Sequence, residues 1–350
     1  MKLSAHTNIS DSFHGITAFR LISEELSLVK KLMDEQLTVH ITESSEHKKA
    51  LKDIDQLLES LRSRYGKMLR PGLVLLAGKC FGPITNEHIQ VAASIEMIHN
   101  ATLLHDDVID DGKRRRGQPS INSIWGNESA VLLGDFLLSK VFKICAELET
   151  NVANIIATAA VRLCEGELRQ IAQKRNWQLT ESEYIDVITE KSAVLFSSCC
   201  HLGALLSGAD KSQIRMLSDY GLNAGIAFQI TDDLLDIIGD EKRTGKTLGS
   251  DVNKCKLTLA VIHLLGTVDK VKRDELINTY LESGNSRPDT KAFAKILEQT
   301  GSLEYARNQA QEYVTKAIDS LNGLDESSPL RSEAKNALIE TAKFMANRAV

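Results

Sequence analysis

Apolar residues recur every three or four positions along most of the chain, and this spacing predicts amphipathic α-helices. Residues 16–37 and 131–149 show the pattern most clearly. Only five prolines interrupt the 350 residues, and no segment alternates apolar and polar side chains as a half-buried strand would. The sequence therefore predicts an all-α fold of roughly a dozen helices, without a sheet.

Polar residues and glycines beside the periodic segments predict where helices begin and end. Thr85 and Thr180 are expected to begin helices, and Glu183 completes a capping box with Thr180. Four glycines are expected to end helices: Gly82, Gly112, Gly208 and Gly239.

Linker-like composition is confined to residues 282–290 and 322–329, which we interpret as loops between C-terminal helices. Residues 1–350 are therefore predicted to form a single domain, with residues 1–40 as an N-terminal helical extension.

The composition narrows the class of protein. Hydrophobic residues make up 43% of the chain, which is ample for a buried core. The net charge of -5 argues against a nucleic-acid partner. No apolar run approaches the roughly 20 residues needed to cross a bilayer, and the first residues lack the pattern of a secretory or transit leader. These observations predict a cytoplasmic location.

The six cysteines contain no CxxC pair and mostly lie in apolar helical segments, so we expect them to be small core residues. A metal or redox site at the adjacent Cys199 and Cys200 is disfavoured because neighbouring helical residues point in different directions.

Four aspartates, Asp106, Asp107, Asp110 and Asp111, follow an apolar helical run and precede Gly112. Carboxylates there face the negative end of the helix dipole, so a cation is expected to offset them. Asp106 and Asp110 share one helix face, one turn apart. Such a two-carboxylate site suits Mg²⁺, which takes its remaining ligands from water and substrate phosphates.

The same DDxxD spacing recurs at Asp232, Asp233 and Asp236, again after apolar residues and again close to a glycine. If the two helix ends face each other, their carboxylates could hold Mg²⁺ ions around a diphosphate. The alternative is two unrelated, solvated acidic patches.

Cationic residues flank both acidic segments. Lys67 and Arg70 precede Pro71, which can occupy the first turn of a helix. Arg114, Arg115 and Arg116 follow the first motif, and Lys246 and Lys256 follow the second. Arginine and lysine both bind phosphate, arginine in a bidentate manner. Solvated turns, or a nucleic-acid patch at residues 113–116, are the alternatives.

Three segments together resemble the trans-isoprenyl diphosphate synthases, and most of all the long-chain polyprenyl diphosphate synthases: GKMLRP, EMIHNATLLHDDVIDDGKRRRGQP and GIAFQITDDLLDIIGDEKRTGKTLGSDV. The resemblance runs from about residue 51 to 265 with the motifs in order. It implies an isoprenoid synthase fold, with helices around a deep central cavity and the two aspartate motifs facing each other at its mouth.

The resemblance also implies the reaction, a Mg²⁺-dependent condensation of isopentenyl diphosphate head-to-tail onto an allylic diphosphate in isoprenoid biosynthesis. Mg²⁺ on Asp106, Asp110 and Asp232 would neutralise the departing diphosphate, and the allylic cation would be attacked by the isopentenyl double bond. A proton would then leave, with the released diphosphate as its acceptor, and no side chain need act as nucleophile.

The family's substrate contacts map onto this chain position by position. Lys67, Arg70, His99 and Arg116 match the residues that hold isopentenyl diphosphate. Arg115, Lys191, Ser192 and Gln229 match contacts to the allylic substrate, whose diphosphate Lys246 and Lys256 also reach. Tyr65 and Ser192 stand where the family more often has glycine and threonine. Lys254 is the alternative to Lys256 for the last lysine.

Product length is expected to depend on side chains below the first motif. Small residues at Ala101 and Thr102 leave the path open toward Ile98 and Met97, which predicts a long-chain product. In the alternative, Phe136 or Leu137 of another helix forms the floor. The product would then be shorter, such as geranylgeranyl or farnesyl diphosphate.

Two other functions are weaker alternatives. A terpene cyclase would carry a different second metal motif and would not need Lys67 and Arg70. A partner subunit of a heteromeric synthase would typically have lost aspartates that this chain keeps. The resemblance further implies a homodimer, and contact with a membrane surface when a lipid product leaves.

Overall fold

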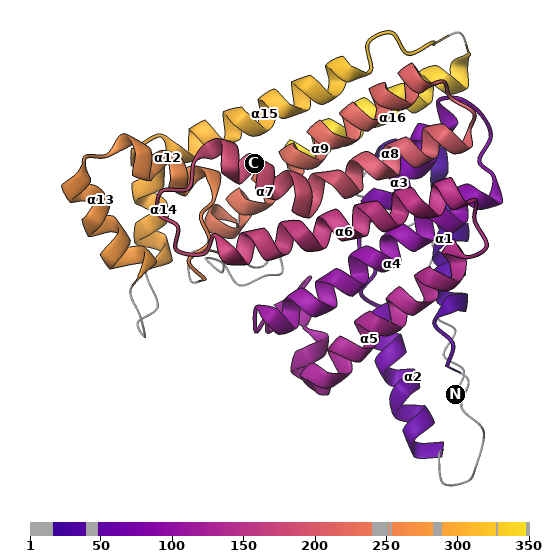
Figure 1. The fold of residues 1–350 in the computed structure, drawn as a ribbon, viewed down its shortest axis with the longest axis horizontal. Coiled ribbons are helices and arrows are strands. Elements are labelled where there is room, and N and C mark those ends of the chain that lie inside the picture. Colours follow the sequence, from indigo (N-terminus) through magenta and orange to yellow (C-terminus); the bar gives the residue numbers. More distant parts are fainter. Residues whose placement is uncertain are drawn as a thin grey trace.

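The computed structural model describes residues 17–39, 48–239, 251, 254–282, 289–326 and 328–347, with the backbone alone for Thr17 and residues 48–51. Long helices lie side by side and form most of the molecule (Figure 1). This confirms the predicted all-α class. The elements in the first half of the chain are η2(Thr17–Ile22), a 3-10 helix, α1(Ser23–Gln36), α2(Lys48–Arg62), α3(Leu69–Lys79), α4(Asn86–Ile109), β1(Arg114–Arg115), β2(Gln118–Pro119), α5(Ile121–Cys145) and α6(Thr150–Ala172).

The second half of the chain continues the bundle and adds a group of shorter helices at one end (Figure 1). Its elements are α7(Glu181–Ile188), η3(Thr189–Ala193), a π-helix, α8(Val194–Leu206), α9(Lys211–Ile238), α12(Leu259–Thr267), α13(Lys270–Leu276), η4(Ile277–Leu281), a π-helix, α14(Thr290–Gln299), α15(Ser302–Ser320) and α16(Pro329–Ala346).

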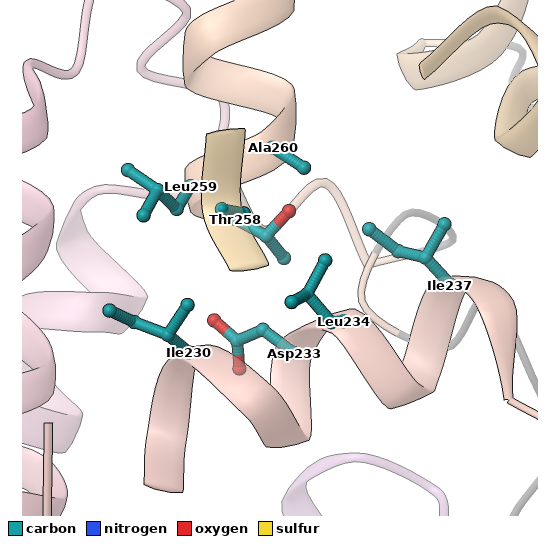
Figure 2. A pocket seen from close by; sticks show the side chains of 8 residues that line it. Ile230, Asp233, Leu234, Ile237, Thr258, Leu259 and Ala260 are labelled. Atoms are coloured by element: carbon teal, nitrogen blue, oxygen red, sulfur yellow. The ribbon is translucent and has the colours of Figure 1, made fainter. Parts of the chain in front are cut away.

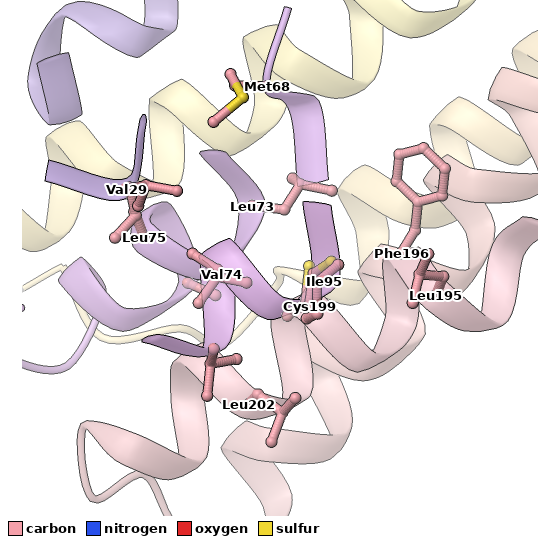
Figure 3. Close-up of a cluster of buried hydrophobic side chains, with 14 of the residues drawn as sticks. Val29, Met68, Leu73, Val74, Leu75, Ile95, Leu195, Phe196, Cys199 and Leu202 are labelled. Carbon is pink, nitrogen blue, oxygen red and sulfur yellow. The ribbon is translucent and has the colours of Figure 1, made fainter. Parts of the chain in front are cut away.

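The larger of two apolar clusters lies between α1, α3, α4, α5 and α8. Helix α4 is buried on most sides between Val91 and Ile98, because neighbours pack against it from several directions. Figure 3 shows side chains of α3, α4 and α8, among them Leu73, Ile95 and Leu202, meeting in this cluster. The end of α4, which carries the first aspartate motif, is thus held by a rigid core.

The second apolar cluster joins the C-terminal half of α9 to α7, α12, α14 and α15. Helix α9 is 28 residues long and contributes to both clusters, with Leu217 in the first and Ile230 in the second. The second aspartate motif therefore sits on a helix that is anchored at both ends.

Both predicted helix starts are confirmed. Thr85 forms a capping box with His88 at the start of α4. Thr180 and Glu183 form the predicted capping box at the start of α7, where the Glu183 backbone N–H donates to the Thr180 hydroxyl.

The predicted glycine stops are confirmed in part. Gly208, two residues after the end of α8, adopts a φ of 76°, which glycine accommodates without strain. Gly239 directly follows α9 with a φ of −64°, so it ends the helix without the left-handed turn. After α4 the left-handed residue is Asp111, with a φ of 47°, rather than Gly112. Aspartate tolerates this conformation better than most residues.

A small hairpin contradicts the expectation of no sheet. Arg114 and Arg115 pair with Pro119 and Gln118 in an antiparallel ladder. Arg116 and Gly117 connect them with φ values of 52° and 79°, as in a type I′ turn. Strands of two residues are too short to produce a periodic pattern of apolar side chains, so the sequence did not predict them.

Three of the six cysteines are core residues as expected: Cys80, Cys199 and Cys200 are buried. Cys145 and Cys255 are half-buried, and Cys164 is exposed on α6. None of the six forms a disulfide within the described residues. Within the described residues, no helix combines the length and apolar character needed to cross a membrane.

Candidate active site

The first aspartate motif occupies the C-terminal end of α4. Asp106 and Asp107 lie in its last turn, and Asp110 caps the helix with its backbone N–H donating to the Asp106 carbonyl at 2.8 Å. The motif therefore faces the negative end of the helix dipole, where carboxylates are unfavourable unless cations offset them. Nearby cationic side chains of this chain supply that offset.

Arg115 neutralises Asp107. Its Nε atom donates to Oδ2 at 2.8 Å and to Oδ1 at 3.0 Å, and its Nη2 atom donates to Oδ1 at 2.8 Å. The Asp107 side chain is only 8% exposed. The Asn122 side chain also donates to the Asp107 carbonyl, at 3.0 Å. Asp107 thus fixes the hairpin and the start of α5 against the end of α4.

Asp110 meets two lysines from the segment that follows the second motif. Its Oδ2 atom lies 3.1 Å from Nζ of Lys254 and 3.2 Å from Nζ of Lys256. Burial alone would raise the pKa of Asp110, but Lys256 and Lys254 hold it below its ordinary value. Both lysines that the sequence offered as alternatives reach this carboxylate.

The same segment also touches the second motif. The backbone N–H of Asp251 donates to Oδ2 of Asp236 at 2.9 Å, and the Asp251 carboxylate lies 3.8 Å from Nζ of Lys256. Asp251, Lys254 and Lys256 therefore bridge the ends of α4 and α9. The two aspartate motifs therefore lie close to each other, which agrees with the expectation that the two helix ends face each other.

Asp106 experiences a different environment from Asp110. Burial raises the pKa of Asp106, and Lys191 opposes that shift. The Lys191 ammonium lies 2.5 Å from Oε2 of Glu167 and donates to Oε1 of Gln170 at 2.7 Å, both on α6. Lys191 is thus held by α6 while it acts on Asp106 electrostatically.

Lys191 and Ser192 lie in the π-helix η3, a conformation often found at functional sites. Gly166 of α6 allows this stretch to approach closely, because a Cβ atom there would lie 2.4 Å from the backbone nitrogen of Lys191. Arg162 of α6 pairs in a bidentate manner with Glu190, at 2.7 Å for both contacts. These contacts fix η3 against α6.

The second motif lies in the last two turns of α9. Asp233 accepts a hydrogen bond from the Tyr184 hydroxyl at 2.6 Å and another from the Gln229 side chain at 2.8 Å. Ser192 donates in turn to Oε1 of Gln229 at 2.7 Å.

Asp233 borders a narrow apolar pocket between α9 and α12 (Figure 2). Burial and the neighbouring Asp251 raise the pKa of Asp233. The pocket is lined by Ile230, Asp233, Leu234, Ile237, Thr258, Leu259, Ala260 and Ala306.

Lys67 and Arg70 lie at the start of α3, with Pro71 in its first turn as predicted. The Arg70 guanidinium is buried and stacks 4.4 Å from the centroid of the Phe196 ring. Lys67 lies with Nζ 4.7 Å from the centroid of Phe344, near the end of α16. Two cations that the sequence predicted for one substrate thus lie on aromatic faces.

The hairpin brings Arg116 to the same loop. Its guanidinium donates to the Arg64 carbonyl, and Arg64 donates to the Pro119 carbonyl at 3.0 Å. Gly66 lies directly against the guanidinium of Arg116, which would have to shift to make room for a Cβ atom at this position. The predicted cations Lys67, Arg70 and Arg116 are therefore assembled from two chain segments.

Glu96 on α4 is a buried acid that the sequence analysis missed. It is 2% exposed, and burial raises its pKa against the opposing effect of Arg70 and Arg116. Its position three residues before His99, on the same helix face, was the available signal. Arg70 and Arg116 are thus the groups that favour the charged form of Glu96 against its burial.

The residues predicted to control product length lie within the packed bundle. Met97, Ile98 and Ala101 are buried in α4, and Thr102 is half-buried with its hydroxyl donating to the His99 carbonyl at 2.8 Å. In α5, Leu137 is buried and Phe136 is half-buried. Lys246, predicted to reach the allylic diphosphate, lies outside the described residues.

Carboxylates of this kind are the hard oxygen ligands that Mg²⁺ prefers. Among the described residues, no three Asp, Glu, His or Cys side chains are grouped to hold a metal ion. Asp107 and Asp233 direct their oxygens to Arg115, Tyr184 and Gln229. Two motif carboxylates are thus engaged by protein donors, so a Mg²⁺ ion held by the other motif carboxylates would take much of its coordination from water and a phosphate-bearing substrate.

An all-α bundle with two aspartate-rich helix ends, surrounded by cations from three segments, is an arrangement suited to metal ions and a phosphate-bearing ligand. Comparison with known proteins identifies the family. The family model described as polyprenyl synthetase matches residues 51–297. The chain belongs to this family and is a prenyltransferase with the isoprenoid synthase fold.

Individual relatives agree with this assignment. The chain is 36% identical to the octaprenyl diphosphate synthase of Escherichia coli strain K12 over 277 residues, which cover 78% of this chain and 85% of that protein. It is 36% identical over 295 residues to a short chain isoprenyl diphosphate synthase of Methanothermobacter thermautotrophicus. The match covers 83% of this chain and 89% of that protein.

A solved polyprenyl synthase of Caulobacter crescentus CB15, complexed with calcium and isoprenyl diphosphate, superposes with a TM-score of 0.86. It is 29% identical to this chain, and the match covers 95% of this chain and 97% of that one.

Proposed function

We propose that this prenyltransferase uses Mg²⁺ to condense isopentenyl diphosphate head-to-tail onto an allylic diphosphate, and that it makes a long-chain all-trans-polyprenyl diphosphate. The observation that carries the proposal is the bridge between the two motifs, in which Lys254 and Lys256 reach Asp110 while Asp251 reaches Asp236. Two acidic helix ends and their counter-cations thus meet at one place.

The two substrates would bind different cationic groups. Lys191, Lys256 and Arg115 lie around the aspartates and would bind the allylic diphosphate. Lys67, Arg70 and Arg116 lie at the start of α3 and would bind isopentenyl diphosphate, with His99 of α4. Binding both substrates at once would hold the allylic carbon near the isopentenyl double bond, so that the two would react as if they were parts of one molecule.

Asp106, Asp110 and Asp232 are the residues assigned to hold Mg²⁺, which would neutralise the departing diphosphate as its bond to the allylic carbon breaks. The Lys256 and Lys191 ammonium groups add fixed positive charge where that negative charge develops. The isopentenyl double bond forms the new carbon–carbon bond, and the proton lost from the adjacent carbon passes to the released diphosphate.

The proposed chain length rests on residues rather than on relatives, because equally similar relatives carry short-chain and octaprenyl names. Ala101 lies about one turn before the first aspartates and is fully buried, with only a methyl group as side chain. A small residue there supports an open path for the growing chain.

A homodimer is part of the proposal. Large apolar side chains are exposed on two helices that follow each other in the chain, Leu132 and Phe142 on α5 and Val161 and Leu168 on α6. Exposed apolar surface of this kind is typical of protein–protein interfaces. Membrane contact during product release and a cytoplasmic location stay predictions from the sequence.

The test is incubation of the purified chain with Mg²⁺, labelled isopentenyl diphosphate and farnesyl diphosphate, followed by separation of the dephosphorylated products by length. A ladder that ends in a long polyprenol is expected. A geranylgeranyl product would retain the chemistry and contradict the open path. Asp232→Asn is the inactive control.

If the wild-type chain incorporates no label with short, medium or long allylic starters, the proposal of a self-sufficient synthase is wrong. The chain would then act as a subunit of a heteromeric enzyme, and activity should appear when its partner chain is added.

A further inference from the structure

Four side chains from three elements form a continuous chain of hydrogen bonds beside the second motif. Ser192 of η3 donates to Oε1 of Gln229 at 2.7 Å. Nε2 of Gln229 donates to Oδ1 of Asp233 at 2.8 Å, and the Tyr184 hydroxyl donates to Oδ2 at 2.6 Å. Tyr184 comes from α7, while Gln229 and Asp233 come from α9.

In this series of hydrogen bonds, Asp233 fixes which group donates and which accepts at each step. A carboxylate can only accept, so Asp233 requires the amide nitrogen of Gln229 on its side. The amide oxygen must then face Ser192, whose hydroxyl donates to it. The hydrogen bonds from Tyr184 and Gln229 stabilise the ionised form of Asp233. In that form, Asp233 determines which way the Gln229 amide and the Ser192 hydroxyl point.

Tyr184 holds the other side of that carboxylate. Its side chain is 3% exposed, and it packs in the second apolar cluster with Ile188 and Ile230. Figure 2 shows Asp233 beside the apolar side chains of Ile230, Leu234 and Leu259. Without the Tyr184 hydroxyl, Oδ2 would face an apolar environment that disfavours an unpaired charge.

We propose that Tyr184 and Asp233 are positioning residues for prenyl transfer, which act by orienting Gln229 and Ser192 toward the allylic substrate. Asp233 on this view is an anchor rather than a metal ligand, since each of its oxygens has a protein donor. The inference rests on the proposed function, because it takes Gln229 and Ser192 as contacts to the allylic chain.

Tyr184→Phe is the central variant, because it removes one hydroxyl and keeps the ring in its apolar cluster. The KM for the allylic diphosphate is expected to rise, or kcat to fall, by about 10-fold or more, a typical effect of losing a group that orients a ligand contact. The KM for isopentenyl diphosphate should change less than twofold.

Tyr305→Phe is a matched control. The Tyr305 hydroxyl also donates to a carboxylate of α7, Oε2 of Glu181, at the same distance of 2.6 Å. It lies outside the hydrogen-bond chain. If both variants lower thermal stability equally and only Tyr184→Phe changes the allylic kinetics, a purely structural role for Tyr184 is excluded.

Asp233→Asn provides a second route if Tyr184→Phe folds poorly. An amide that accepts from Tyr184 presents its NH₂ group to the NH₂ group of Gln229, so the Gln229 amide must turn over. The same allylic defect is expected, while the Mg²⁺ concentration for half-maximal activity stays within twofold of wild type. A large increase in that concentration would show that Asp233 binds metal, and the inference would be wrong.

The wild-type chain separates this inference from the proposed function. Absence of prenyl transfer by the wild type would overturn the proposed function and this inference with it. Active wild type together with Tyr184→Phe kinetics equal to those of Tyr305→Phe would overturn the inference alone.

Discussion

The ammonium nitrogen of Lys256 lies 3.2 Å from Oδ2 of Asp110, which joins residues 146 positions apart in the chain. Lys256 is only 11% exposed, and Lys254 contacts the same oxygen. One metal-binding candidate of the first motif is therefore neutralised by the segment that follows the second. Asp106, one turn earlier, has the opposite pKa shift because burial dominates there.

This contrast predicts opposite stability effects for two variants in the absence of metal. Asp110→Asn should destabilise the protein by about 1 kcal/mol or less, because it removes partly exposed ion pairs. Asp106→Asn should stabilise it slightly, because it removes a charge that burial disfavours. Both variants should lose nearly all prenyl transfer activity.

Thermal denaturation as a function of pH measures the difference. A lowered pKa means that Asp110 contributes stability above its ordinary pKa, and that this contribution is lost as the pH falls through the lowered value. A raised pKa means that Asp106 lowers stability as the pH rises through the raised value. Parallel pH profiles for the two variants would contradict this.

Arg115→Lys should destabilise the fold by about 1–3 kcal/mol, because lysine cannot reproduce the bidentate contact with Asp107. Urea denaturation measures the loss. Lys113→Arg is a suitable control, since its partner Asp111 is exposed and its change should be small. Equal losses of stability from the two substitutions would show that the bidentate contact between Arg115 and Asp107 has no structural role.

Phe344→Leu tests the contact between α16 and Lys67. Leucine keeps the apolar bulk and removes the ring face on which the ammonium lies, so Lys67 should become less ordered. We expect the KM for isopentenyl diphosphate to rise about 2–10-fold, with kcat and the allylic KM nearly unchanged. A decrease in that KM would mean that the ring holds Lys67 away from the substrate.

Ala101→Phe should shorten the product, because a ring at this buried position would block the path below the first motif. The substitution should also destabilise the protein by about 1–3 kcal/mol through overpacking. Product length is read after chromatographic separation. Phe136→Ala is the companion variant on α5. If Phe136→Ala gives a longer product and Ala101→Phe leaves the length unchanged, the side chains that stop growth of the product belong to α5.

Leu168→Glu should weaken the proposed homodimer. Leu168 is 67% exposed on α6, so the change should alter the stability of an isolated chain by about 0.5 kcal/mol or less. Light scattering with size exclusion should show a shift from dimer to monomer. The same change at Val271, exposed on α13, is the control and should leave the mass unchanged. A monomeric wild type would contradict the prediction.

Regular secondary structure was largely predictable because it depends on local patterns. The capping box of Thr180 and Glu183 and the start of α4 after Thr85 were confirmed. The hairpin at residues 114–119 was missed, since it is held by a two-residue turn and by Arg64 of a distant segment. The left-handed turn at Asp111 was likewise assigned to its neighbour Gly112.

Site residues divide in a similar way. Those that carry a motif of charge and spacing, such as Asp106 and Asp232, could be proposed from the sequence, and their roles stay predictions. Their supporting residues could not. Glu167 and Gln170 hold Lys191, and Tyr184 holds Asp233, although nothing in the order of residues marks these pairs.

The sequence by itself determined the helices, the two acidic helix ends and the cations that follow them, because hydrophobic period, caps and charge clusters are local properties of the chain. Only the tertiary structure decided which cation neutralises which aspartate. That choice depends on contacts between residues as distant as Asp110 and Lys256, which packing of α4 against α5 and of α9 against its neighbours brings within hydrogen-bond distance.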